Sequence, residues 1–231
     1  MKKDHAKLVL IFITLAAAGI SPNLFVAAQA GYALMSDLVV QFLIPSILII
    51  IGVLIYAFRS NHQDLGRQIL VGLVGGLLGT VGLEVVRHIG FLMGGMPGEM
   101  PKLLGVLILN RFAQGPNALS NLVGWSYHFW NGATFGIIYS LLFGRGKLSY
   151  GILYAILIGV GFMAGPAAVA MGVGRFGVDF GIGFPLTVTL AHLAFGSILG
   201  WYVHKKNENA ESIICVLKAY LKSAAVSPST K

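Results

Sequence analysis

The chain has 231 residues, of which 56% are hydrophobic and only 10% are charged. Soluble domains carry about 25% charged residues, so this composition excludes an ordinary water-soluble domain. The formal net charge of +8 comes from basic residues beside apolar runs, not from a basic patch interleaved with aromatic side chains, so we expect no nucleic-acid partner.

Six apolar runs are long enough to cross a bilayer core as helices, which takes about 20 residues. They cover residues 8–28, 38–58, 68–93, 121–143, 150–172 and 184–203. The sequence therefore predicts an all-α fold, a polytopic membrane bundle of six transmembrane helices. We expect one transmembrane domain over residues 1–206 and a tail over residues 207–231.

The first run also resembles a secretory signal peptide. Basic residues precede an apolar stretch, and "AQA" ends at Ala30, where a signal peptidase could cut. Two interpretations stay open: a signal peptide over residues 1–30 that is removed, or an uncleaved first helix bent at Pro22. We favour the uncleaved helix, and the other five spans keep one orientation in either case.

Basic residues predict the orientation of the spans. Lys2, Lys3 and Lys7 precede the first span, and Lys205 and Lys206 follow the last one. Because basic loops stay on the untranslocated side, we expect a multi-pass protein of the bacterial inner membrane with both termini in the cytoplasm. The tail has an amphipathic segment over residues 211–222 that could rest on anionic lipid.

The third run contains glycines at helical spacing, which predicts close helix packing. Small residues let helix backbones approach one another inside a bilayer. The residues concerned are Gly72, Gly75, Gly76, Gly79 and Gly82.

Residues 94–120 form the one long loop, on the predicted outer side. Its middle, "KLLGVLILNRF", is too short to span a bilayer and too apolar for a free loop. We predict a short interfacial or re-entrant helix within residues 96–120 that caps the outer end of the bundle.

Ionisable side chains inside the predicted spans are costly in lipid and often mark function. The third span has Glu84, Arg87 and His88, the fourth has His128 and Asn131, and the sixth has His192. With a helical rise of about 1.5 Å per residue, the three histidines reach one level in the outer half of the membrane. We therefore predict a shared pocket there, with Met96, Glu99 and Met100 of the loop just above it.

The residue types in this pocket suit a metal ion. Imidazole and carboxylate groups bind zinc, iron or copper, so the predicted ligands are Glu84, His88, His128 and His192, with Asn131 orienting an imidazole. Haem b between two histidines is an alternative. We expect the site to bind an apolar small molecule or a lipid from the outer leaflet, with or without catalysis.

Two other functions stay open. A transporter or channel-like protein would use broken helices, and the Gly165–Pro166 pair predicts one such break. An accessory subunit or assembly factor would use the histidines structurally and would bind a larger membrane complex.

The segment "AHLAFGSILGW" around His192 resembles the last catalytic helix of the rhomboid intramembrane proteases. The resemblance covers a small part of the chain and implies an intramembrane hydrolase, with Ser126 of "GWS" as the nucleophile and His192 as the base. The chain departs from the rhomboid pattern at Tyr127, where a glycine should follow the nucleophile.

Overall fold

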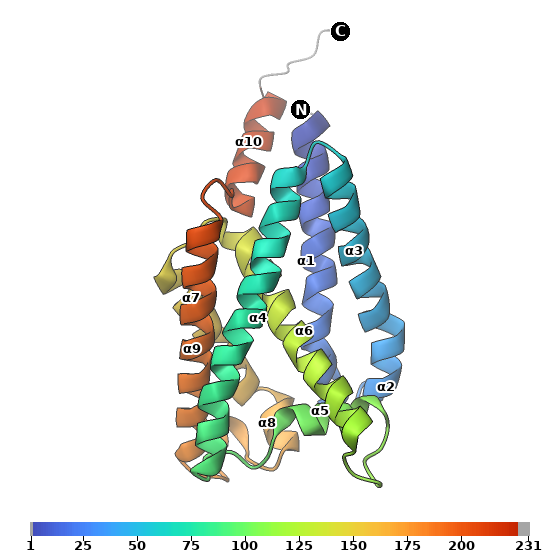
Figure 1. Cartoon of the computed structure of the whole chain (residues 1–231), viewed down its shortest axis with the longest axis vertical. Helices are drawn as coiled ribbons and strands as arrows, with labels where there is room; N and C mark the ends of the chain where they lie inside the picture. Colours follow the sequence, from blue (N-terminus) through green and yellow to red (C-terminus); the bar gives the residue numbers. More distant parts are fainter. Residues whose placement is uncertain (1, 226–231) are drawn as a thin grey trace.

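A computed structural model describes residues 2–225 of the chain, and every regular element within them is helical (Figure 1). The predicted all-α bundle is confirmed. The long helices are α1 (Lys2–Gln29), α3 (Ile44–Arg59), α4 (Gln63–Leu92), α6 (Ala118–Phe143), α7 (Leu148–Ala164) and α9 (Gly183–Lys206). The short elements are α2 (Met35–Leu38), the π-helical turn η1 (Val39–Leu43), α5 (Met100–Ile108), α8 (Pro166–Ala170), the 3₁₀ turn η2 (Arg175–Gly177) and α10 (Ile213–Ala225).

Within residues 2–225, four helical stretches are long and apolar enough to cross a membrane: His5–Gln29, Met35–Arg59, Gln63–Leu92 and Gly183–Lys206. These helices indicate an integral membrane protein. Helix α7 is apolar but has only 17 residues. Helix α6 has 26 residues but is not among the four, and it packs against α1, α4 and α5. The number of spans therefore stays a prediction.

Glycines set the spacing around α4, which packs along α6 on one side and α9 on the other. A Cβ atom on Gly72 would come within 2.6 Å of the Gly136 carbonyl oxygen, and one on Gly76 would collide with the Gly132 backbone. The α9-facing glycines are Gly75, Gly79 and Gly82. The predicted glycine strip therefore lets two helices, α6 and α9, pack closely against α4.

The two ends of the bundle differ. The beginning of α1 and helix α10 lie at one end, whereas α2, α5 and α8 lie at the other (Figure 1). Helix α5 is the short helix predicted for the long loop, and it packs tightly on α6. A Cβ atom on Gly124 would collide with the Pro101 carbonyl oxygen, so glycine is required where the two backbones meet.

The break predicted at Gly165–Pro166 is present between α7 and α8. Gly165 has extended backbone geometry, with φ −79° and ψ 173°, and Pro166 begins α8. Proline cannot donate to the preceding helical turn but suits the first position of a new helix. The chain therefore restarts as α8 at the end that also holds α5.

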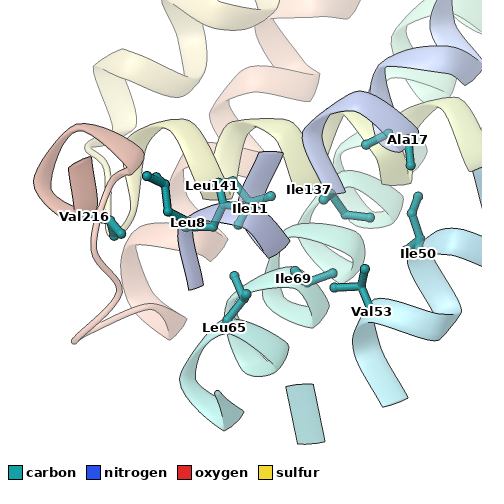
Figure 2. Close-up of a cluster of buried hydrophobic side chains, with 11 residues drawn as sticks. Leu8, Ile11, Ala17, Ile50, Val53, Leu65, Ile69, Ile137, Leu141 and Val216 are labelled. Atoms are coloured by element: carbon teal, nitrogen blue, oxygen red, sulfur yellow. The ribbon is translucent and has the colours of Figure 1, made fainter. Parts of the chain in front are cut away.

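The tail is part of the bundle. Figure 2 shows Val216 of α10 in a cluster with side chains of α1, α3, α4 and α6, including Leu8 and Leu141. Val216 is only 3% exposed. The Gln68 amide Nε2 also donates a hydrogen bond to the Glu211 carbonyl oxygen, at 3.0 Å. One face of the predicted amphipathic tail helix therefore contacts protein.

Candidate functional site

A pocket of about 440 Å³ is lined by residues of α1, α4, α5, α6, α7 and α9 and by Met96 of the loop before α5. Most of its wall is apolar, with Leu83, Phe135, Ile158, Phe162 and Phe195 among the lining residues. Six of the nine residues singled out from the sequence also line it: Arg87, Met96, Met100, His128, Asn131 and His192.

Glu84 binds two basic groups at the edge of this pocket. The guanidinium of Arg87 donates to it twice, from Nε to Oε1 at 2.8 Å and from Nη2 to Oε2 at 2.5 Å. His128 Nε2 lies 2.8 Å from the same Oε1, within ion-pair distance but without hydrogen-bond alignment. The Glu84 and Arg87 side chains are only 10% and 7% exposed. A bidentate ion pair is the arrangement by which an arginine is tolerated inside an apolar bundle.

His88 does not join this site. The sequence pattern predicted it in the pocket with the other two histidines, but its side chain is exposed while Glu84 and Arg87 are buried. Adjacent residues on an α-helix point about 100° apart, and on α4 it is Arg87 that turns towards Glu84 and the pocket. Arginine always carries its charge and needs the carboxylate, whereas a histidine can be neutral, so Arg87 takes the inward position.

His192 is held by its own helix. Its Nδ1 lies 2.8 Å from the Val188 carbonyl oxygen. Because a carbonyl oxygen can only accept, Nδ1 carries the proton, and Nε2 of the neutral ring is left as an acceptor. Gly159 of α7 makes room for the ring, since a Cβ atom there would lie 2.9 Å from His192 Cγ.

Helix α1 supplies part of the site that the sequence analysis missed. The Ser21 hydroxyl donates to Asn131 Oδ1 at 2.5 Å, and the Tyr127 hydroxyl donates to the Ser21 carbonyl oxygen at 2.6 Å. Pro22, Phe25 and neighbouring α1 residues line the pocket. The one available signal was the polar break "SPN" within an otherwise apolar run.

The residues of the long loop divide into two groups. Met96 and Met100 line the pocket, whereas Glu99 forms an ion pair with Lys102, one turn further along α5. The thioethers therefore belong to the pocket wall, and the Glu99 carboxylate has a partner of its own.

Residues 66–213 match the protein family described as a family of unknown function, DUF6789. The chain belongs to DUF6789. No curated protein and no solved structure matches it. The matched region runs from α4 to the start of α10 and includes Glu84, Arg87, His128 and His192.

The geometry of this DUF6789 protein bears on the metal hypothesis. Among the described residues, no three histidine, cysteine, aspartate or glutamate side chains gather in a group that could hold a metal ion. His128 and His192 both line the pocket, but His88 is exposed and both Glu84 oxygens contact Arg87. Binding of zinc, iron, copper or haem stays a prediction, and the described side chains form no ready group of metal ligands.

The rhomboid-like pair is not brought together. Ser126 lies on an exposed part of α6, and its hydroxyl donates to the Leu122 carbonyl oxygen at 2.8 Å. His192 lines the pocket, and Ser126 is not among the lining residues. Helix α6 turns Tyr127 and His128 inward, and the serine two residues before His128 therefore points elsewhere.

Proposed function

We propose that this protein binds a small amphipathic molecule of the membrane in the pocket. Its polar end would lie at Arg87, His128 and His192, and its apolar body would lie against the rest of the wall. The observation that carries this proposal is a largely apolar pocket with a few polar side chains gathered from α4, α6 and α9. That combination is typical of small-molecule sites, where apolar walls supply affinity and a few polar groups fix orientation.

The size of the pocket limits the ligand. Its volume of about 440 Å³ falls in the lower half of the range of roughly 300–1,000 Å³ that is usual for small-molecule sites. A molecule with one chain or one ring system fits this volume. A complete two-chain phospholipid does not.

The arrangement of α1 and α7 favours entry from the bilayer. Both helices line the pocket, yet α1 packs mainly on α6 and α3, and α7 packs mainly on α9. Asn23 and Val26 of α1 and Gly161 of α7 all line the pocket. Gly161 is exposed, and a Cβ atom there would meet nothing within 4 Å. We therefore place the entrance between α1 and α7.

Photocrosslinking with a bifunctional fatty acid, which carries a diazirine and an alkyne, tests this proposal in proteoliposomes. We expect labelled peptides from α1, α6 and α7. Gly161→Phe should reduce labelling several-fold by filling the entrance. Gly52→Phe is the matched control, because Gly52 of α3 is also exposed with nothing within 4 Å and does not line the pocket. Equal labelling of both variants, at sites outside the pocket, would contradict the proposal.

The same purified protein separates the other functions. Stoichiometric metal, or the absorption spectrum of a haem, would favour the cofactor that the histidines suggested. Movement of the fatty acid across sealed vesicles would favour a transporter. Co-purification with a larger complex, together with tolerance of alanine at His128 and His192, would favour an accessory subunit.

A further inference from the structure

We infer that the polar end of the ligand is an oxyanion, a carboxylate or a phosphate ester, and that Arg87 binds it. This inference rests on the proposed function and adds the chemical class of the headgroup. It depends on the hydrogen-bonding groups of Arg87 that Glu84 leaves free.

The guanidinium of Arg87 is only partly satisfied by the protein. Glu84 accepts from Nε and Nη2, whereas Nη1 is buried and has no acceptor among the described residues. The side chain is 93% buried and lines the pocket. Arginine cannot lose its proton to avoid this cost, and buried donors without a partner are rare in folded proteins. Nη1 itself has almost no accessible surface, so a small rotation of the side chain into the pocket that Arg87 lines would bring it to an acceptor on a ligand.

The charges of the polar wall favour an anion over a neutral acceptor. Arg87 and Glu84 cancel one another, and both carboxylate oxygens of Glu84 already contact the guanidinium. The single carboxylate of Glu84 faces two basic side chains, Arg87 and His128. A second anion from the ligand would share these partners. A pair between arginine and a carboxylate or phosphate gains the attraction of opposite charges in addition to the hydrogen bond, and this attraction is stronger away from water.

Competition against the bifunctional fatty acid tests the headgroup directly. The competitors share one dodecyl chain and differ only in their end group: carboxylate, phosphate, hydroxyl or trimethylammonium. We expect the two acids to displace the probe about tenfold better than the alcohol or the ammonium compound, as a charged hydrogen bond implies. The stronger of the two acids then distinguishes a fatty acid from a phosphorylated amphiphile.

Two variants keep the test interpretable. Arg87→Gln should remove the preference for acids, but it leaves Glu84 without its main partner. The double variant Glu84→Gln/Arg87→Gln removes both charges and leaves no unpaired ion, and it should lose the tenfold preference for acids over the alcohol. Equal competition by all four compounds would overturn the headgroup inference and leave the pocket proposal standing. Failure of the probe to label the pocket in the unmodified protein would overturn both.

Discussion

At the scale of single residues, Glu84 is the acceptor that keeps Arg87 and His128 inside an apolar bundle. Its two oxygens lie within 2.8 Å of nitrogen atoms of both side chains. Removing one partner of a buried ion pair is far more damaging than removing both, because the survivor stays charged and desolvated. The pair is therefore expected to behave non-additively.

Glu84→Gln should destabilise the protein by about 3–5 kcal/mol, because Arg87 is left as a buried charge without a carboxylate. The double variant Glu84→Gln/Arg87→Gln should lose less stability than Glu84→Gln alone, because it leaves no buried charge without a partner. His88→Ala is the control on the same helix; His88 is exposed, so we expect a change within about 0.5 kcal/mol. Thermal unfolding of the detergent-purified variants measures these differences. A single Glu84→Gln variant as stable as His88→Ala would contradict this account of the pair.

A second prediction concerns the space beneath His192. In Gly159→Ala, the added methyl group would lie about 2.9 Å from the imidazole, so the ring must move or α7 must shift. We expect a loss of about 1–3 kcal/mol, as overpacked sites show, together with weaker probe labelling. Gly161→Ala on the same helix meets nothing within 4 Å and should be neutral or slightly stabilising. If Gly161→Ala were less stable than Gly159→Ala, Gly159 would not be the residue that positions His192.

The sequence anticipated these residues better than their partners. The cost of polar groups in lipid was enough to predict that His128, Asn131, His192 and Arg87 share a pocket. It also placed His88 in that pocket, where the structure has Arg87 instead, because the inward position depends on which group Glu84 binds. The contribution of Ser21 was missed because it depends on a contact between helices 110 residues apart in the chain.

At the scale of elements, α4 and α6 are held together by glycine backbones. The two pairs that meet are Gly72 with Gly136 and Gly76 with Gly132. Their crossing also places Glu84 on α4 beside His128 on α6. The packing of this helix pair and the geometry of the pocket are therefore coupled.

Gly76→Val tests that coupling. The added side chain would collide with the Gly132 backbone, which cannot move aside as a flexible side chain can. We expect a loss at the upper end of the roughly 1–3 kcal/mol of overpacking or beyond it, seen as a low yield of monodisperse protein in size-exclusion chromatography. Gly52→Val on α3 meets open space and should give an ordinary yield. Normal behaviour of Gly76→Val would mean that the two helices can separate without loss of fold.

The sequence predicted helices and helix ends where a local pattern marks them. It did not predict features that depend on contacts between distant parts of the chain. Apolar run length predicted α1, α3, α4 and α9, and Gly165–Pro166 predicted the break before α8. The docking of α10 had no local signal, because it depends on Val216 and on the Gln68 bond to the Glu211 carbonyl oxygen. An amphipathic pattern shows that one face will be buried but not against what.

At the scale of the whole molecule, the two ends of the bundle have different chemistry. At the end with α10, Lys7 forms ion pairs with Asp64 and Glu211, so the first helix, the start of α4 and the tail are linked. Most basic residues that flank the helices belong to this end, whereas Lys102 of α5, Arg111 and Arg175 of η2 lie at the other. This asymmetry is the signal from which we predict cytoplasmic termini, and under that prediction the pocket would lie in the outer half of the membrane.

The single cysteine provides a test of that orientation. Cys215 is exposed on α10, so a maleimide reagent that cannot cross membranes should leave it unlabelled in intact cells and label it after lysis. Gly98→Cys, made together with Cys215→Ser, should be labelled in intact cells, because Gly98 lies in the loop before α5 and a side chain there meets nothing within 4 Å. Both positions are free to react, so a difference between them reports the side of the membrane rather than burial. Labelling of Cys215 but not of the new cysteine in intact cells would invert the predicted orientation of the bundle, and the pocket with its proposed entrance would then lie in the inner half of the membrane.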